Sequence, residues 1–287
     1  MDHQGTIIRP PNEAGSILLQ VAVGCPHGAC TFCGAYHGHP YRPKDMVTVA
    51  DDVDHAARHC QDQRRVFLCG GDALALPAAR LLEVLALVRA RLPWVTRVGA
   101  YASARSLAAR TDGELRALRQ AGLATVYMGL ESGDDAVLAR VRKGADSAAI
   151  VAQGQRARAA GLRLNVTVLL GLAGEEGAQA HARATGAALT AMQPDHVGAL
   201  TLMLVPGTAL FADAARGAFA LPGPMAMLAE LRTLLEHTRL ERGQFLTDHA
   251  SNHLALRVRL PGGRAEALER IDAALAGRVP LRQRRGL

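Results

Sequence analysis

The feature that most constrains the fold is a repeated alternation of short apolar segments with longer, alanine-rich amphipathic segments. This alternation is typical of βα units, which pair their strands into a parallel sheet. The six expected strands cover residues 17–23, 65–69, 95–101, 124–130, 162–170 and 196–204. The helical patterns between them lie near residues 47–62, 77–91, 111–121, 134–141, 147–160 and 175–191.

Six βα units are fewer than the eight that close a barrel. The sequence therefore predicts an α/β fold built on a partial (β/α)6 TIM-like barrel with parallel strands. The strand rhythm stops after residue 208, and helical patterns at 222–243 and 264–276 then flank an extended segment at 254–260. We expect two domains: a core of residues 1–215, and a small, mainly helical C-terminal extension of residues 216–287 packed on it.

The formal net charge of +7 raises the possibility of a nucleic-acid partner. The arginines, however, are spread along the expected helices, and the densest group is the tail Arg278, Arg282, Arg284 and Arg285. Aromatic residues make up only 3% of the chain, so no basic surface rich in stacking side chains is apparent. We expect a solvated basic surface and no nucleic-acid partner.

Three of the five cysteines, Cys25, Cys30 and Cys33, fall within nine residues. Disulfide frameworks of secreted proteins space an even number of cysteines along a short chain, so this pattern indicates metal ligation in a reducing compartment. No apolar run reaches the roughly 18–20 residues of a membrane span, and the first residues lack the layout of a signal peptide. We expect a cytoplasmic protein with no membrane partner.

The cysteine loop, GCPHGACTFCGAY at residues 24–36, directly follows the first expected strand. It should therefore lie at the C-terminal edge of the sheet, where parallel α/β folds place their chemistry. Three thiolates suit a [4Fe–4S] cluster and leave one of its four irons open. The same cysteines could instead form a zinc site with one histidine, namely His27, His37 or His39.

The spacing Cys-x4-Cys-x2-Cys, with Phe32 before the last cysteine, resembles the cluster loop of the radical S-adenosylmethionine (SAM) superfamily, whose commonest spacing is Cys-x3-Cys-x2-Cys. The spacing here has one extra residue. In this respect it resembles the loops of methylthiotransferases, Elongator-type acetyltransferases and oxygen-independent coproporphyrinogen oxidases. The resemblance implies that Cys25, Cys30 and Cys33 are the metal ligands of a [4Fe–4S] cluster that binds SAM. It further implies that Phe32 and Tyr36 shield the adenine ring.

Two further segments resemble the part of the family's site that holds the methionine moiety of SAM. Gly70, Gly71 and Asp72 resemble the Gly-Gly-Glu motif, whose backbone and acid receive the SAM ammonium, although Asp72 stands where Glu is usual. The segment MGLESG at 128–133, followed by RKG at 142–144, also matches the family pattern. It implies that Glu131 and Lys143 lie near the amino acid end or the ribose of SAM.

The segment NVTVLLGLAGE at 165–175 resembles the strand beneath the adenosine of SAM. It implies that Asn165 or Thr167 meets the ribose hydroxyls and that Gly171 lets the backbone approach adenine. The segment LVPGT at 204–208, which contains Val205, resembles the family's last backbone contact to adenine. The alternative interpretation of 165–175 is a buried strand followed by a helix cap at Glu175, with no ligand contact from its side chains.

The resemblance implies that a reduced flavodoxin or ferredoxin supplies an electron and that SAM is cleaved to a 5′-deoxyadenosyl radical, which abstracts hydrogen from a substrate. Outside the loop only Cys60 and Cys69 remain, too few for the second cluster of a methylthiotransferase. This favours a small-molecule or peptide substrate. The alternatives are an RNA-modifying radical SAM enzyme and, from another class, a non-catalytic metal-binding or metal-carrier protein.

The sequence does not identify the residues that act on the substrate, but it offers three candidates. Cys69 adjoins the glycine turn and could donate hydrogen, although a small buried strand residue is the simpler interpretation. His249 and His253 would share a face if the segment TDHASNH at 247–253 were helical. They would then serve as a substrate acid or base, and otherwise as part of a hydrogen-bonded corner.

Overall fold

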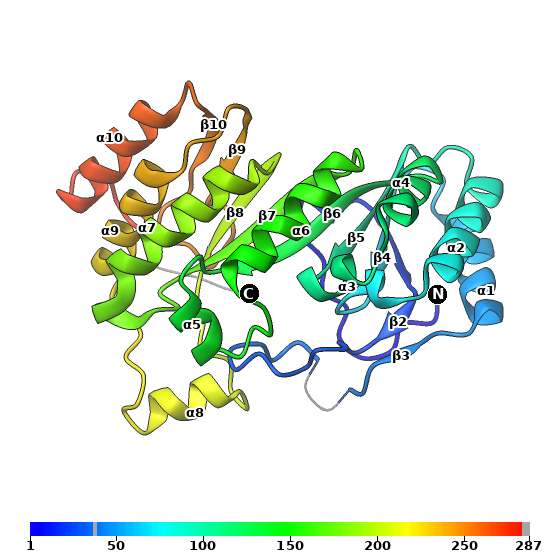
Figure 1. The fold of residues 1–287 in the computed structure, drawn as a ribbon, viewed down its shortest axis with the longest axis horizontal. Helices are drawn as coiled ribbons and strands as arrows, with labels where there is room; N and C mark the ends of the chain where they lie inside the picture. Colours follow the sequence, from blue (N-terminus) through cyan, green and yellow to red (C-terminus); the bar gives the residue numbers. More distant parts are fainter. Residues whose placement is uncertain (37–38, 283–287) are drawn as a thin grey trace. The chain divides into compact units, whose positions relative to one another are not determined.

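The computed structural model describes residues 1–36 and 39–282, and its fold is α/β, with mostly parallel strands alternating with helices along the chain (Figure 1). The chain forms two compact units, which are described separately. The first consists of Met1–Gly28, Ala35–Met128 and Arg156–Leu164, and the second of Ala29–Gly34, Gly129–Gln155 and Asn165–Leu287. The chain passes between the units in the cysteine loop and within β6, α6 and β7.

The first unit is built on four parallel strands that pair in the order β1, β4, β5 and β6. Their bounds are Ile17–Gln20, Arg65–Cys69, Arg97–Ala102 and Leu123–Glu131, the last three residues of β6 belonging to the second unit. The helices are α1 (Met46–His59), α2 (Ala78–Arg91), α3 (Ala104–Ala108) and α4 (Asp112–Gln120), with short 3-10 turns at Pro11–Glu13 and Ala73–Ala75. Helices α1 and α2 pack on each other, as Figure 1 shows.

The expected strand at 17–23 is two strands in the structure. After β1, the Val21 N–H donates to the carbonyl of Cys69 and the Val21 carbonyl accepts from the N–H of Lys44. The chain then leaves the main sheet, and β2 (Ala22–Val23) pairs antiparallel with β3 (Arg42–Pro43). The sequence pattern is continuous because both pieces are buried.

The second unit contains β7 (Arg163–Leu170), of which the part from Asn165 onward belongs to this unit, together with β8 (His196–Thr201) and β9 (Gly243–Leu246). Strand β8 pairs in parallel with both β7 and β9. The last strand, β10 (Arg257–Leu260), pairs antiparallel with β9. Its helices are α5 (Asp135–Arg140), α7 (Gly174–Met192), α8 (Ala209–Ala215), α9 (Pro224–His237) and α10 (Arg264–Leu275); α6 spans Ser147–Ala159. Helix α9 packs between α7 and α10 (Figure 1).

The region after residue 216 supplies strands as well as helices. The helix expected at 222–243 ends at His237, because Thr238 is extended and the following residues lead into β9. Strand β9 then extends the parallel pairing of β8, which the sequence pattern did not indicate. The predicted domain boundary between residues 215 and 216 stays a prediction.

Helix ends agree with the punctuation of the sequence. Thr111 and Glu114 form a reciprocal capping box at the start of α4, with N–H to side-chain distances of 2.8 and 3.1 Å. Gly122 and Gly161, which follow α4 and α6, adopt φ values of +118° and +84° that glycine tolerates best. Within residues 1–36 and 39–282, no helix is both long and apolar enough to cross a bilayer.

Candidate cofactor site

The first part of the cysteine loop, up to Gly28, belongs to the first unit and lies against the glycine turn that follows β4. The N–H of Gly71 donates to the carbonyl of Gly24 at 2.8 Å. A Cβ on Gly71 would overlap Cys25, and a Cβ on Gly24, which has φ +73°, would overlap the carbonyl of His39. Both glycines are therefore required for close backbone approach, and together they fix where Cys25 begins the loop.

Substitution of Gly71 by alanine is expected to displace Cys25 and to reduce the iron bound after anaerobic reconstitution to less than about half of the parent value, because a thiolate moved by roughly 1 Å no longer matches the cluster. Iron and sulfide per chain provide the measurement. Gly113→Ala is the matched control, since a Cβ there comes no nearer than 3.8 Å to another group. Full iron content in Gly71→Ala would show that the close approach does not position Cys25.

The second part of the loop, Ala29–Gly34, belongs to the second unit and is fixed by backbone hydrogen bonds. The Thr31 N–H donates to the carbonyl of Val141 at 3.0 Å, and the Thr31 carbonyl accepts from the N–H of Leu210 at 2.9 Å. The Cys33 N–H donates to the Cys30 carbonyl at 3.2 Å, so the two cysteines flank a tight turn. Phe32 packs against a buried cluster of Val137, Val141, Leu172, Ala173, Leu202, Leu210 and Phe219.

Glu131 and Lys143 are brought together in the second unit, as the sequence segments implied. The Lys143 Nζ lies 2.9 Å from Glu131 Oε1, and both side chains are largely buried. Burial alone lowers the pKa of Lys143, but the Glu131 carboxylate and the thiolates of Cys30 and Cys33 raise it, and the net pKa lies above its ordinary value. The ammonium is therefore held in its charged form beside the second half of the cysteine loop.

Asp72, in the first unit, faces the start of α3. Its Oδ1 accepts the hydroxyl of Ser106 at 2.9 Å, and its Oδ2 accepts the N–H of Ser103 at 3.2 Å. Burial raises the pKa of this carboxyl, and the hydrogen bonds from Ser103 and Ser106 oppose that rise only in part. No local sequence pattern predicts that these two serines hold Asp72, because they lie more than thirty residues further along the chain.

Tyr41 is a further polar group of the first unit that the sequence did not single out. Its buried hydroxyl has no hydrogen-bond partner within the part of the chain that the structure describes. Burial raises its pKa, and the charges of Asp72 and Cys25 add to the rise. A buried, unpaired hydroxyl beside these two groups fits a site that takes an additional polar group.

The residues expected beneath adenosine lie in the second unit. Asn165 is buried in β7 and Thr167 is half-buried on the same face of the strand. The N–H of Gly171 donates to both carboxylate oxygens of Glu230, at 2.9 and 3.0 Å, so α9 holds the turn after β7. The carbonyl of Val205 accepts the N–H of Thr208 at 3.2 Å, in the turn before α8.

Tyr36, expected beside adenine, is half-buried in the first unit, and its carbonyl accepts the N–H of His39 at 3.2 Å. Among the histidines weighed as zinc ligands, His27 is half-buried and His39 is exposed, whereas His37 lies outside the described residues. In residues 1–36 and 39–282, no three His, Cys, Asp or Glu side chains are grouped as a metal site. The predicted ligands are divided, with Cys25 in the first unit and Cys30 and Cys33 in the second.

The donor chemistry nevertheless fits an iron–sulfur cluster. Cys25, Cys30 and Cys33 are half-buried, and none of them forms a disulfide. Thiolates are the usual ligands of such clusters. In the second unit, the ammonium of Lys143 beside Cys30 and Cys33 supplies a polar group that a bound cofactor would use.

Cys69 is fully buried at the end of β4, with its Sγ 3.5 Å from the carbonyl of Phe67. Burial raises the pKa of its thiol to about 12. About one thiol in ten thousand is then ionised at pH 8, and thiolate chemistry at this position is suppressed. The structure thus gives Cys69 the properties of a core residue, and its predicted role in hydrogen donation stays a prediction.

Iodoacetamide at pH 8 is therefore expected to leave Cys69 unmodified in the folded, cluster-free protein and to modify it only in urea, because both burial and the raised pKa remove the reactive thiolate. Peptide mass spectrometry measures the modified fraction at each cysteine. Half-buried Cys60 serves as the internal comparison. Modification of Cys69 as fast as Cys60 under native conditions would show that the thiol is accessible.

The segment at 247–253 is not helical, so His249 and His253 do not share a helix face. It forms a hydrogen-bonded corner instead: the Asn252 side chain donates to the Ala199 carbonyl at 2.9 Å and accepts from the Thr201 hydroxyl at 2.9 Å. His249 Nδ1 lies 2.9 Å from Ser251 Oγ, and burial lowers the pKa of this imidazole. A catalytic role for either histidine stays a prediction.

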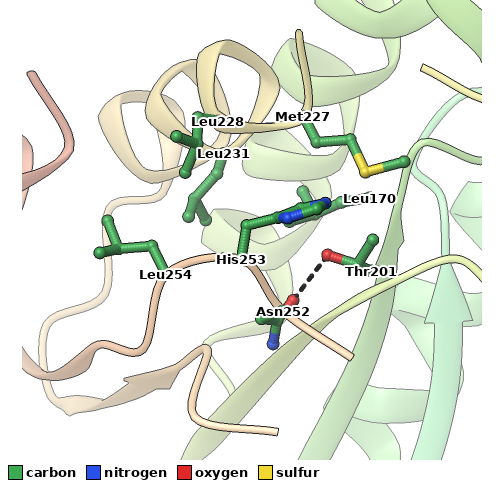
Figure 2. A pocket seen from close by; sticks show the side chains of 8 residues that line it. All are labelled: Leu170, Thr201, Met227, Leu228, Leu231, Asn252, His253 and Leu254. Carbon is green, nitrogen blue, oxygen red and sulfur yellow. Dashed lines mark hydrogen bonds between the residues drawn. The ribbon is translucent and has the colours of Figure 1, made fainter. Parts of the chain in front are cut away.

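His253 lines a small pocket at the ends of β7 and β8. Its imidazole points towards Leu170, with Met227 above it and the Thr201–Asn252 hydrogen bond below (Figure 2). The pocket is lined by Leu170, Thr201, Met227, Leu228, Leu231, Asn252, His253 and Leu254. It lies at the C-terminal ends of parallel strands, where such folds bind ligands.

The structure thus combines a mostly parallel α/β fold with a three-cysteine loop after β2 and an acid–lysine pair beside the second half of that loop. Residues 19–182, more than half of the chain, match the Radical SAM superfamily. The chain belongs to this superfamily. The cofactors of the superfamily are a [4Fe–4S] cluster and SAM. A search among curated proteins finds no match.

Several solved structures have a similar fold at low sequence identity. Methylornithine synthase, PylB, is 14% identical, with a TM-score of 0.55 over 93% of this chain and 82% of its own. The radical SAM enzyme HemN of Escherichia coli, coproporphyrinogen III oxidase, is 18% identical, with a TM-score of 0.55 over 77% of this chain and 51% of its own. The methyltransferase TsrM of Kitasatospora setae, solved with cobalamin and a [4Fe–4S] cluster, is 18% identical, with a TM-score of 0.56 over 93% and 54%.

At these identities the likeness shows the fold alone, and it confirms the predicted fold class. The chain spans about half the length or less of the first solved structures that it matches. It covers 51% of HemN, 50% of the [FeFe]-hydrogenase maturase HydG and 30% of the cobalamin-dependent radical enzyme OxsB.

Proposed function

We propose that this enzyme binds a [4Fe–4S] cluster through Cys25, Cys30 and Cys33 and binds SAM at the remaining iron. The observation that carries the proposal is the family match over residues 19–182, which begins before the three half-buried loop cysteines and extends past Lys143. When bound and reduced, the cluster would supply the electron that cleaves SAM into methionine and a 5′-deoxyadenosyl radical, which abstracts hydrogen from the substrate.

The chain's own residues would bind the two ends of SAM and orient them. Lys143, kept charged by Glu131, would attract the SAM carboxylate. The backbone at Gly70 and Gly71 would receive the ammonium, and Asp72 would act mainly by holding α3 beside that turn.

The adenosine end would lie on β7 and the turns that follow the strands. The side chains proposed to meet it are Asn165 and Thr167, together with the backbone at Gly171 and Val205. Phe32 and Tyr36 would exclude water from the adenine ring. Holding both ends of SAM places the bond to be broken in one position, which is the main contribution that a protein makes to this chemistry.

Radical SAM enzymes need an electron donor and a substrate. We propose a flavodoxin or ferredoxin as the donor, and a small molecule or peptide as the substrate. Cys60 and Cys69 are the only cysteines outside the loop, which does not favour a second cluster of the methylthiotransferase type. The clustering of three of the five cysteines within nine residues supports a reducing compartment such as the cytoplasm.

The test is anaerobic incubation of the reconstituted protein with dithionite and SAM, followed by chromatography of the nucleosides. We expect 5′-deoxyadenosine to appear only when protein, reductant and SAM are all present. Addition of cell extract is expected to increase its release, and extract fractions then lead to the substrate. A protein that binds one zinc and no sulfide, or one that releases no 5′-deoxyadenosine, would contradict the proposal.

A further inference from the structure

A chain of three buried polar side chains runs through the second unit and connects β6, α7 and α9. Ser132 Oγ lies 2.7 Å from His181 Nδ1, and His181 Nε2 lies 3.3 Å from Glu230 Oε1. The exposed fractions of Ser132, His181 and Glu230 are 0%, 1% and 0%. A buried carboxylate or imidazole is costly to retain unless it is paired, so each member of this chain depends on the next.

Both ends of the chain are attached to backbone that borders the proposed SAM site. At one end, Glu230 accepts the N–H of Gly171, in the turn after β7. At the other end, Ser132 Oγ accepts the N–H of Asp134 at 2.9 Å. The N–H of Gly133 donates to Thr185 Oγ1 at 2.9 Å, and a Cβ on Gly133 would overlap the carbonyl of Ala184 in α7.

The segment fixed in this way directly follows Glu131, whose backbone is unusual. Glu131 has φ +61°, a left-handed conformation that costs a residue with a side chain on the order of 1 kcal/mol or more. This conformation folds the Glu131 carboxylate back over Gly129 towards Lys143: a Cβ on Gly129 would overlap Glu131 Oε1 and lie 2.8 Å from Lys143 Nζ. The conformation persists only because the backbone that follows it, at Gly133 and Asp134, is held by hydrogen bonds to Thr185 and Ser132.

A serine, a histidine and a glutamate that contact one another in this order resemble the arrangement of a hydrolase triad, but here no substrate reaches the serine. All three side chains are buried, and the Ser132 hydroxyl oxygen already accepts a backbone N–H. A nucleophile must be exposed to its substrate. The arrangement therefore acts through the backbone that it holds.

We propose that the Ser132–His181–Glu230 chain is a positioning network, through which α7 and α9 hold the Glu131–Lys143 pair and the Gly171 turn in the geometry that SAM requires. The inference rests on the proposed function, since it takes the Glu131–Lys143 pair to be a SAM contact. It assigns to α9, which follows residue 216, a direct part in forming the site.

The network is tested by the dissociation constant of SAM for the anaerobic, cluster-loaded protein, measured by equilibrium dialysis, together with the urea midpoint of each variant. Ser132→Ala, which removes one hydroxyl, is expected to weaken SAM binding at least about fivefold, and Glu230→Ala more than about tenfold. Glu230→Gln, which keeps an acceptor for Gly171, is expected to recover most of that loss.

Thr233→Ala is the matched control, because it breaks another α7–α9 hydrogen bond, the 2.6 Å contact of Thr233 with Gln179, on the exposed side of the same helices. It is expected to bind SAM within about twofold of the parent. If Ser132→Ala folds and binds SAM as tightly as the parent, the network does not position the site, whatever happens to Glu230→Ala.

Glu131→Gln separates the inference from the function on which it rests. If Glu131→Gln weakens SAM binding while Ser132→Ala and Glu230→Ala do not, the network proposal alone is overturned. If Glu131→Gln also binds SAM normally, the pair is not a SAM contact, and both the site assignment and the network are overturned.

Discussion

Substitution of Cys30 by alanine is expected to lower the rate of 5′-deoxyadenosine formation at least about a thousandfold, a barrier increase of roughly 4 kcal/mol, because two thiolates do not retain a cubane cluster. The same result is expected for Cys25 and Cys33. Iron and sulfide per chain after anaerobic reconstitution should fall in parallel with the rate. Both quantities are measured on the same protein preparation.

Cys60→Ala is the control for this series. Cys60 is half-buried at the end of α1 and lies outside the loop, so its replacement should leave iron content and activity within about twofold of the parent. Retention of a full cluster after loss of any one of the three loop cysteines would contradict the ligand assignment.

Removal of the Lys143 ammonium is expected to be the second large effect. In Lys143→Ala the dissociation constant of SAM should rise about 30-fold or more, because a charge-assisted contact to a carboxylate in a partly buried site contributes about 2–3 kcal/mol. The loss also leaves the Glu131 carboxylate without its 2.9 Å ion-pair partner, and the uncompensated charge then repels the carboxylate group of SAM. Equilibrium dialysis with the cluster-loaded protein provides the value.

Two comparison variants show whether the effect comes from the charge at this position. Lys143→Arg keeps a cation and is expected to retain most of the affinity, with a partial loss because the guanidinium is larger and planar. Arg142→Ala removes the exposed cation next to it in the chain and should change SAM binding less than about twofold. Equal losses in Lys143→Ala and Arg142→Ala would indicate a general electrostatic effect.

The alternation of apolar and amphipathic segments was sufficient to predict the six parallel strands, because parallel strands are buried on both faces and appear as continuous apolar runs. The errors lie where pairing depends on distant residues. The pattern at 17–23 did not show that the Lys44 N–H donates to the Val21 carbonyl, at the point where the chain leaves β1 and begins β2. It also did not show that β9 joins β8, since β9 has only four residues.

The site was predictable where it consists of linear motifs and not where it depends on contacts across the fold. The spacing of the cysteines and the segment containing Glu131 are local signals. His181 and Glu230 are distant from those motifs in sequence, and Tyr41, although close to the cysteine loop, belongs to no motif. Glu230 carries one retrospective signal: it lies among Met227 and the buried leucines of α9, where a carboxylate is exceptional unless it is paired.

The most direct measurement of the central claim is the electron paramagnetic resonance spectrum of the dithionite-reduced protein before and after SAM is added. If one iron of the cluster is open and SAM coordinates it beside Lys143, the spectrum of the reduced cluster changes when SAM binds, and it does so at lower SAM concentration in the parent than in Lys143→Ala. An unchanged spectrum at saturating SAM would contradict the account.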